Sequence, residues 1–247
     1  MLAAYENVNW AAVVPLANEA DDFAIFEASL VKVLNELGSG HVFLIIDGAS
    51  TDNTRALIQD LARRDARFEE IWAPENRNVV DAYLRGFRAS LDGGYELTIE
   101  MDAGMSHDPA AIPMFLRVLH EGNECAFGSR YINGGSMVDS PWKRRLLSKG
   151  GSIVARMLLG VKMHDLTSGF QGFHRDVLRR LLAYPLKSKA HFYQTEVRYL
   201  LRHARRIEVP IHYRAPSPRV SSGAIKNSVQ VLRHYVVQRL LMRAPHV

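Results

Sequence analysis

The chain has 247 residues, of which 47% are hydrophobic and 23% charged, so it can bury a substantial core and is not disordered as a whole. Its 31 Lys and Arg residues against 26 Asp and Glu residues give a net charge of +5, which suits an anionic ligand, a lipid phosphate or a nucleic acid. Cys125 is the only cysteine, which excludes an internal disulfide and indicates a reducing compartment.

Neither a membrane span nor a leader is expected from the sequence. No segment approaches the ~18 consecutive apolar residues of a spanning helix, and the first residues lack the basic start and apolar core of a signal peptide. We therefore expect a cytoplasmic protein, either soluble or peripheral at the inner face of the membrane.

Apolar runs of strand length alternate with helical patterns in the amino-terminal half. The predicted strands cover residues 10–14, 42–46, 68–72, 95–101 and 124–127, and the predicted helices cover 22–37, 53–64, 79–91 and 109–121. This alternation predicts an α/β fold whose parallel sheet is covered by helices on both faces. Right-handed crossovers would gather the loops that follow the strands along one edge, where we expect the chemistry.

The pattern changes after Tyr131. A predicted loop is followed by a basic helix, a Gly-containing segment, a helix, a strand and a last helix, at residues 132–141, 142–160, 165–175, 193–204, 206–213 and 224–243. No internal repeat or clear linker appears, so we expect residues 1–247 to form a single domain with an elaborated carboxyl-terminal half.

Polar side chains follow the first two predicted strands. Asn18 and Glu19 come after the first, and Asp47 and Asp52 after the second. A carboxylate at such a strand end can accept hydrogen bonds from the NH groups of a base or from ribose hydroxyls, which predicts a nucleotide site. A structural alternative is open: Asn18 and Glu19 would cap the following helix, and Asp52 would be a helix cap whatever the function.

The run Thr98-Ile99-Glu100-Met101-Asp102-Ala103-Gly104-Met105-Ser106-His107-Asp108-Pro109 delivers Asp102 from a strand to a loop. It resembles the family 2 inverting glycosyltransferases, particularly the dolichol phosphate mannose synthase-like polyprenyl phosphate glycosyltransferases, which read Asp-Ala-Asp-Leu-Ser-His-Asp-Pro. This chain keeps all of that run except the second Asp, replaced by Gly104, and the Leu, replaced by Met105. The resemblance implies a GT-A fold, a Rossmann-like and mostly parallel sheet flanked by helices. Residues 10–130 would be its nucleotide-sugar-binding half and 131–247 its acceptor-side half.

Three further stretches match the donor side of that family. Residues 13–19 resemble its Pro-x-x-Asn-Glu opening, residues 45–54 its Asp-Asp-Gly-Ser-Thr-Asp-x-Thr run, and residues 74–82 its Asn-x-Gly-x-Gly stretch. Gly48 stands in place of an Asp, and Asn78 and Val80 stand where glycines are usual; of these two, Asn tolerates a left-handed backbone better. The residues that the resemblance assigns to donor binding are Pro15, Ala17, Glu19, Asp47, Asn76, Asp102, Ala103, Gly104, Arg214 and Arg219.

The resemblance also implies a metal. In the related enzymes the Asp-x-Asp pair binds Mg²⁺ or Mn²⁺, which bridges the donor diphosphate and stabilises the leaving group. Asp102 remains as the implied ligand, because Mg²⁺ often takes only one or two protein carboxylates. Glu100 as a shifted partner, and Ser106, are alternative ligands. A metal-independent enzyme and a catalytically impaired nucleotide-sugar-binding protein both stay open.

The acceptor side is matched by Gly128-Ser129-Arg130-Tyr131 and by the Trp-x-x-x-Arg-x-x-x-Ser pattern that opens the next helix. By this resemblance Arg130, Arg144 and Ser148 would hold the acceptor's phosphate, and Asp102 and Arg130 would be catalytic. An Arg fork suits phosphate oxygens. Residues 165–173 resemble the family's Asp-Leu-Thr-Ser-Gly-Phe run, in which Asp165 is equally well a structural hydrogen-bond acceptor or a site residue.

The activity implied is inverting transfer of a sugar from a nucleoside diphosphate sugar, GDP-mannose-like or a UDP-sugar, to a polyprenyl phosphate. Such a phosphate is already mostly dianionic at neutral pH, so it needs positioning more than a general base. A non-lipid acceptor is the alternative, and it would need a base such as Asp165 or His107. No nucleic-acid-binding motif is present.

Overall fold

The computed structural model describes residues 8–104, 106–137, 142–214, 222–245 and 247, without the side chains of 142–147 and 222. Its strands are β1 (Trp10–Leu16), β2 (His41–Ile46), β3 (Phe68–Trp72), β4 (Leu97–Glu100), β5 (Cys125–Ser129), β6 (Gln171–His174) and β7 (Arg206–Pro210). The helices are α1 (Phe23–Leu37), α2 (Thr54–Arg64), α3 (Val79–Asp92), α4 (Ile112–His120), α5 (Trp142–Leu159), α6 (Arg175–Ala183), α7 (Tyr193–Leu200) and α8 (Ser222–Leu240). A short 3₁₀ helix, Pro109–Ala111, precedes α4.

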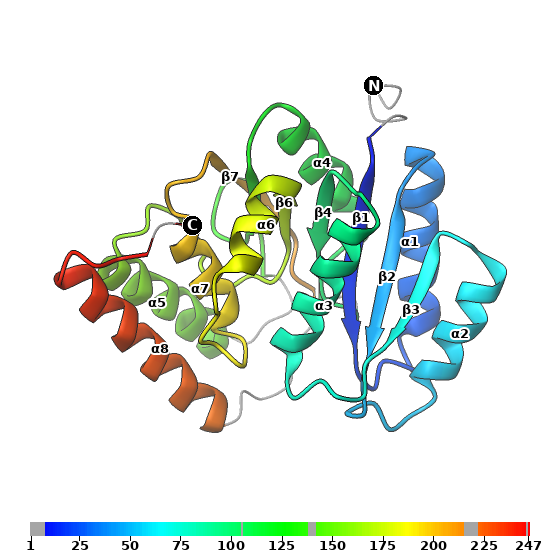
Figure 1. Cartoon of the computed structure of the whole chain (residues 1–247), viewed down its shortest axis with the longest axis horizontal. Coiled ribbons are helices and arrows are strands. Elements are labelled where there is room, and N and C mark those ends of the chain that lie inside the picture. The colour runs from blue at the N-terminus through cyan, green and yellow to red at the C-terminus, as the bar shows by residue number, and fades with distance from the viewer. Residues whose placement is uncertain (1–7, 105, 138–141, 215–221, 246) are drawn as a thin grey trace.

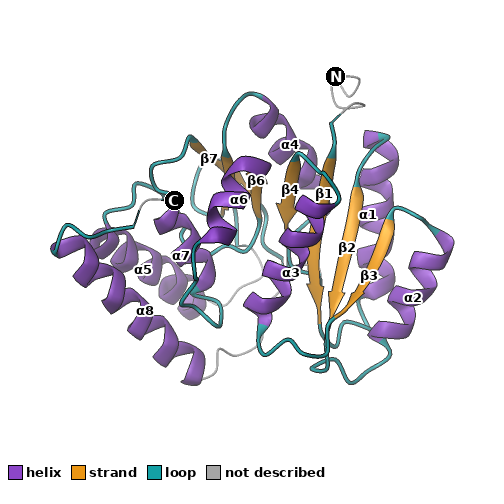
Figure 2. Cartoon of the chain, viewed as in Figure 1, coloured by secondary structure: helices purple, strands orange, loops and turns teal. Residues whose placement is uncertain are grey.

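These strands form a seven-stranded sheet in the order β3-β2-β1-β4-β6-β5-β7 (Figures 1 and 2). Every pairing is parallel except those of β6, which runs antiparallel to both β4 and β5. The predicted α/β class and mostly parallel sheet are therefore confirmed. Strand β6 and helix α6, which lie in and directly after the Gly-containing segment, were not predicted.

Helices cover both faces of the sheet. Leu30 of α1 and Phe115 of α4 belong to the buried cluster on one face, whereas Phe87 of α3 and Tyr193 of α7 belong to the cluster on the other. Helices α5 and α8 contact each other at one end of the molecule (Figure 1). The central strands are buried on both sides, which explains why they read as continuous apolar runs in the sequence.

The strand order creates a switch point at the centre of the sheet. The chain builds outward from β1 to β2 and β3, then returns to the opposite side of β1 with β4. The carboxyl ends of β1 and β4 therefore diverge into loops on opposite sides, which is where open α/β sheets bind their ligands. Among the described residues, no helix is both long and apolar enough to cross a membrane.

Candidate active site

The loops after β1 and β2 are tied together by Asn18. Its Oδ1 accepts a hydrogen bond from the backbone N–H of Thr51 at 2.9 Å, and its Nδ2 donates to the carbonyl of Ala49 at 3.2 Å. Asn18 adopts a left-handed backbone with φ of 57°, a conformation that Asn tolerates better than most residues. The capping alternative is wrong for Asn18, because the N-cap of α1 is Asp22.

Asp52 and Asp47 shape the second of these loops. Asp52 accepts hydrogen bonds from the backbone N–H groups of Thr54 and Ala20, both at 3.0 Å, and its bonds, first that to the side chain of Thr54, lower its pKa to about 2. The helix-cap role expected of Asp52 is wrong, because the N-cap of α2 is Asn53; Asp52 instead ties the loops after β1 and β2 together. Asp47 Oδ1 accepts from the backbone N–H of Ala49 at 2.9 Å, and the residue is partly exposed at the end of β2.

Asp102 lies at the end of β4 with its side chain 40% exposed. The hydroxyl of Tyr83, from α3, donates a hydrogen bond to Asp102 Oδ1. A Cβ on Gly169 would stand 3.2 Å from both oxygens of the carboxylate. Tyr83 and Gly169 therefore fix where the Asp102 carboxylate sits. Neither role was predicted: an aromatic at helical spacing reads as core, and Gly169 was only part of a matched run.

His107 is buried beneath the same loop and accepts a hydrogen bond from its backbone. Its side chain is 1% exposed, and its Nδ1 accepts a hydrogen bond from the backbone N–H of Asp102 at 3.0 Å. An accepting Nδ1 carries no proton, so the ring is neutral, and burial lowers its pKa further. His107 is thus a buried structural group, which weakens its candidacy as a general base.

Glu19 and Gly104 face each other across the switch point. Gly104 has a left-handed backbone with φ of 70°, and a Cβ built on it would stand 2.5 Å from Glu19 Oε2. Burial, and then the negative charges of Asp22, Asp102 and Asp52, raise the pKa of Glu19 to about 7. The carboxylate of Glu19 thus occupies the space above Gly104, close to other carboxylates.

The residues present fit a divalent ion. Asp102 and Glu19 together give the one or two carboxylates that Mg²⁺ usually takes from a protein, with phosphate and water oxygens completing its shell. No three of the described His, Cys, Asp and Glu residues are grouped so as to hold a metal on their own. Such an ion would therefore depend on donor oxygens for the rest of its coordination.

Glu100 is placed differently from the other acids. It is fully buried on β4, and its Oε2 accepts hydrogen bonds from Gln171 Nε2 and from the Tyr193 hydroxyl, both at 2.9 Å. Burial raises its pKa to about 8, so it is protonated at neutral pH. We do not retain Glu100 as a metal ligand, because a buried and protonated carboxyl is a poor one. Ser106 is half-buried in the loop after Asp102.

The third donor-side stretch lies after β3. Asn76 accepts from Arg85 Nε at 3.4 Å, while its buried Nδ2 has no hydrogen-bond partner among the described residues. An unsatisfied buried donor is costly, so this amide is suited to a ligand atom. The left-handed geometry considered for Asn78 is wrong: its φ is −166°, and it caps α3 by accepting from the backbone N–H groups of Val80 and Asp81.

Arg130 is buried in an ion pair on the acceptor side. Its Nε lies 2.7 Å from Asp165 Oδ2 and its Nη2 lies 2.9 Å from Asp165 Oδ1, and Nη2 also donates to Thr167 Oγ1 at 2.6 Å. Burial alone would raise the pKa of Asp165, but the hydrogen bond and charge of Arg130 hold it below its ordinary value. Of the two roles left open for Asp165, the structural one is observed, since it orients Arg130.

The remaining predicted site residues are only partly brought together. The Tyr131 hydroxyl donates to Ser148 Oγ at 2.9 Å, which places Ser148 beside the residue that follows Arg130. The side chain of Arg144, and Arg219, lie outside the described residues. Arg214 forms an ion pair with Asp108 at 2.9 Å, at the loop after β4. The other predicted donor contacts lie along the strand ends: Pro15 is half-buried, Ala17 is exposed and Ala103 is buried.

The chain resembles known proteins over most of its length. The model of the family described as Glycosyl transferase family 2 matches residues 11–182. The polyprenol monophosphomannose synthase of Mycolicibacterium smegmatis is 33% identical over 186 residues, which are 75% of this chain and 69% of that protein. The undecaprenyl-phosphate mannosyltransferase of Micrococcus luteus is 30% identical over 203 residues, 81% of this chain and 82% of that protein.

More distant relatives agree on the fold. The dolichol-phosphate mannosyltransferase of Pyrococcus furiosus is 26% identical over 90% of this chain and 61% of that protein. The structure of glucosyl-3-phosphoglycerate synthase from Mycobacterium tuberculosis with uridine diphosphate has a TM-score of 0.64 at 18% identity, over 98% of this chain and 82% of that one. A structure of the same synthase contains Mn²⁺ as well. The predicted GT-A fold and family are confirmed, and the chain belongs to glycosyl transferase family 2, as a glycosyltransferase.

Proposed function

We propose that this glycosyltransferase transfers a sugar from a nucleoside diphosphate sugar to a polyprenyl phosphate, with inversion at the anomeric carbon. The observation that carries the proposal is the position of Asp102: partly exposed, oriented by Tyr83 and Gly169, and next to Glu19 at the switch point. The names of the relatives at 30% identity and above support a mannosyl donor and a polyprenyl phosphate acceptor.

The donor site is assigned to the loops after β1, β2, β3 and β4. Asp47 and the unpartnered amide of Asn76 would bind the nucleoside, through hydrogen bonds to base or ribose. The diphosphate would lie beside Asp102. Mg²⁺ or Mn²⁺ would be held here by carboxylates of this chain, and when bound it neutralises charge on the departing diphosphate.

The acceptor phosphate is assigned to the side of Arg130 and Ser148. Asp165 holds Arg130 in one orientation, so the guanidinium is positioned before the acceptor arrives and loses little freedom on binding it. A dianionic phosphate oxygen then forms the bond to the anomeric carbon as the bond to the nucleoside diphosphate breaks. No proton needs to be removed from such a nucleophile. The burial of His107, which cannot serve as an exposed base, agrees with this mechanism.

Because a polyprenyl phosphate is held in a membrane, the proposed reaction requires the protein to reach the membrane surface, as a peripheral protein would. The composition supports such an association, because the net charge of +5 favours anionic surfaces.

The test is a donor and acceptor panel. Radiolabelled GDP-mannose, UDP-glucose and UDP-N-acetylglucosamine are incubated with detergent-dispersed polyprenyl phosphate, with Mn²⁺ or with EDTA, and the label extracted into organic solvent is counted. We expect one donor to give an extractable product that EDTA suppresses. Transfer of label only to a water-soluble sugar or metabolite acceptor would refute the assignment of the acceptor, and no transfer from any donor would refute the activity.

A further inference from the structure

The space beside Gly104, where the family has an aspartate, is occupied by another carboxylate. In the family's run an Asp stands where this chain has Gly104. Here the φ of 70° disfavours any side chain, and a Cβ would lie 2.5 Å from Glu19 Oε2 and 3.2 Å from Glu19 Cδ. In its present conformation the Glu19 carboxylate therefore fills the space that a side chain at 104 would need.

The charges around Glu19 call for a cation. Asp52 accepts a hydrogen bond from the backbone N–H of Ala20, the residue after Glu19, and the Glu19 carboxylate lies against Gly104, two residues after Asp102. Among the described residues, neither Glu19 nor Asp102 forms an ion pair with Lys or Arg, and the one imidazole near Asp102 is neutral. Carboxylates held together without a counter-charge repel one another. A divalent ion bound between them would attract each of them and so offset that repulsion.

We propose that Glu19 supplies the second protein carboxylate of the divalent-ion site, in place of the side chain that Gly104 lacks. The proposal rests on the proposed function only in assuming a diphosphate donor beside Asp102. Glu19 reaches the site from the end of β1, whereas Asp102 reaches it from β4, so the ion would bridge the two loops that flank the switch point.

The test measures metal binding, not turnover. Mn²⁺ is titrated into the protein with GDP and, separately, UDP, and the free ion is followed by electron paramagnetic resonance. We expect Glu19→Gln, which is isosteric, to weaken Mn²⁺ binding by about tenfold or more. Glu36→Gln, an exposed glutamate near the carboxyl end of α1, the helix that follows the Glu19 loop, is the control and should stay within about twofold.

A second variant tests the geometry. In Gly104→Ala the new methyl group must displace the Glu19 carboxylate, so Mn²⁺ binding should weaken much as in Glu19→Gln, and the two changes together should cost no more than either alone. Wild-type affinity in Glu19→Gln, or in Gly104→Ala, would overturn the proposal. That result would concern Mn²⁺ binding alone and would not alter the outcome of the transfer assay. Failure of this inference is therefore distinguishable from failure of the proposed function.

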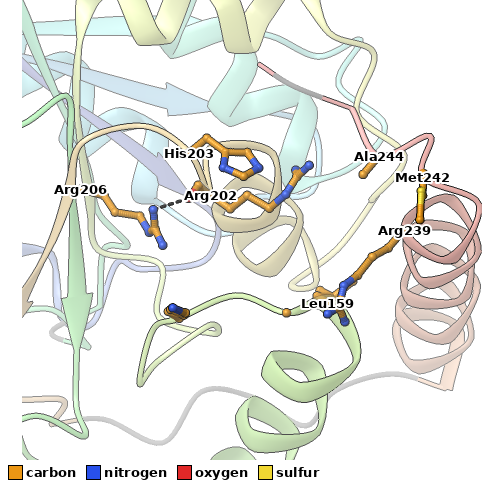
Figure 3. Close-up of a pocket in the computed structure, with 9 residues that line it drawn as sticks. Leu159, Arg202, His203, Arg206, Arg239, Met242 and Ala244 are labelled. Atoms are coloured by element: carbon orange, nitrogen blue, oxygen red, sulfur yellow. Dashed lines mark hydrogen bonds between the residues drawn. The ribbon is translucent and has the colours of Figure 1, made fainter.

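A different region, far from these loops in the fold, carries a second inference. A pocket of about 480 Å³ lies between the ends of α5, α7 and α8, lined by Leu159, Gly160, Lys162, Arg202, His203, Arg206, Arg239, Met242 and Ala244 (Figure 3). Four of these side chains carry a full positive charge at neutral pH, those of Lys162, Arg202, Arg206 and Arg239. None of the four forms an ion pair with a carboxylate within the described part of the chain, where the three arginines donate to backbone carbonyls.

The arginines are held by backbone carbonyls. Arg239 Nη1 donates to the carbonyl of Leu158 at 2.7 Å, and Arg202 Nη1 donates to the carbonyls of Tyr199 and Pro245, both at 2.9 Å. Arg206 Nη1 donates to the carbonyl of Arg202 (Figure 3). Burial, and then the charge of Arg239, lower the pKa of Arg202 despite the opposing effect of Tyr199. The described partners of these guanidinium groups are thus backbone carbonyls and not carboxylates, so their positive charge is left available to an anion.

The pocket is bordered by exposed apolar side chains. Met242, which lines it, is 95% exposed, and Leu240, two residues earlier, is 75% exposed. On α5, Met157 is 65% exposed two residues before the lining residue Leu159, and Leu158 between them is 42% exposed. Large apolar side chains around a positive pocket are the pattern of a surface that enters the headgroup region of a bilayer.

We infer that this pocket binds the phosphate of an anionic phospholipid, and so seats the ends of α5 and α8 on a membrane. The charge selects the headgroup, and the apolar rim enters the boundary with the acyl chains. This deepens the proposed function, since the acceptor proposed there is a lipid, but it involves no residue of the donor or acceptor site.

The test uses the full chain with vesicles of phosphatidylcholine alone and of phosphatidylcholine with phosphatidylglycerol. We expect sedimentation with the anionic vesicles only, lost as salt rises. Lys162→Glu with Arg239→Gln should weaken that binding by about ten- to a hundredfold, from the loss of attraction per charge near an anionic surface. Lys32→Glu, an exposed lysine on α1, is the control and should change it little.

Three results would overturn this inference: equal binding to both kinds of vesicle, no binding to either, or unchanged binding of the double variant. Inorganic phosphate is added as a competitor. If it stabilises the wild-type chain against heat while vesicles do not bind, the pocket takes a soluble anion and the membrane assignment is wrong. A variant of Leu240→Ser, with the charges intact, should also weaken vesicle binding while leaving any response to phosphate unchanged.

Discussion

Replacing Gly169 by alanine probes how exactly placed the Asp102 carboxylate must be. The Cβ would stand 3.2 Å from Oδ1 and Oδ2 of Asp102 and 3.3 Å from Cε1 of His107, all closer than the 3.4 Å at which ordinary contacts begin. His107 is buried and cannot yield easily, whereas Asp102 is 40% exposed. The carboxylate must therefore move by a few tenths of an ångström, away from the position at which Tyr83 holds it.

The size of the effect follows from that displacement. A misplacement of about 1 Å at a reacting site can cost on the order of a hundredfold, so a few tenths of an ångström should lower kcat/KM for the donor by about three- to tenfold. This corresponds to about 0.7–1.4 kcal/mol of transition-state stabilisation. The fold should persist, because Gly169 has an ordinary backbone conformation that alanine can adopt.

The assay is initial-rate transfer with the donor identified by the panel, together with thermal unfolding of each variant. Gly151→Ala on α5 is the matched control: nothing lies within 4 Å of its Cβ, so activity should be unchanged and helix stability slightly raised. Wild-type kcat/KM in a correctly folded Gly169→Ala would show that the exact position of the Asp102 carboxylate does not limit the reaction.

Three other variants test separate parts of the structure. Asp165→Asn leaves the buried Arg130 unpaired and should lower the free energy of unfolding by about 3–5 kcal/mol in urea titrations, whereas Asp176→Asn, whose exposed pair with Arg179 contributes about 1 kcal/mol or less, should not; equal losses would contradict the argument. Glu100, with its pKa raised to about 8, keeps a proton in the folded state that the unfolded chain releases above about pH 4.5, so stability should fall as pH rises through that window, by up to about 1.4 kcal/mol per pH unit. Glu100→Gln should flatten this dependence in unfolding measured from pH 5 to 8, and an unchanged slope would show that Glu100 is not its source. Asn18→Gly keeps the left-handed backbone but loses the bonds to Thr51 and Ala49, so KM for the donor should rise by several-fold with little change in kcat; an unchanged KM would mean that this tie does not shape the donor site.

Buried parallel strands were predicted from the sequence, whereas a short antiparallel strand and the helix after it were not. The strands before Glu19, Asp47 and Asp102 were found because buried parallel strands read as apolar runs ended by polar residues. Strand β6 was missed because it is a short strand, Gln171–His174, that runs antiparallel between two others and carries polar residues at both ends. Helix α6 follows it directly, without a turn signal to separate them.

The sequence pointed to Asp102 and the loops at the strand ends, but not to the residues that hold them in place. The matched runs brought Asp102 and the strand-end loops to one edge, but Tyr83, from α3, gave no signal because its partner is distant in the sequence. Glu100 was an attractive ligand by spacing alone, and only its burial against Gln171 and Tyr193 removes it. Distances between loops, such as that between Glu19 and Gly104, depend on the sheet order, which short-range patterns do not contain.

The most direct test of the central claim compares wild type with Asp102→Asn in one transfer experiment. The change is isosteric and keeps an oxygen for the Tyr83 hydroxyl, so it removes the negative charge and little else. With labelled donor, polyprenyl phosphate and Mn²⁺, the account predicts organic-extractable product from the wild type and a rate at least about a hundredfold lower from Asp102→Asn at unchanged thermal stability. Equal rates from the two proteins would contradict it.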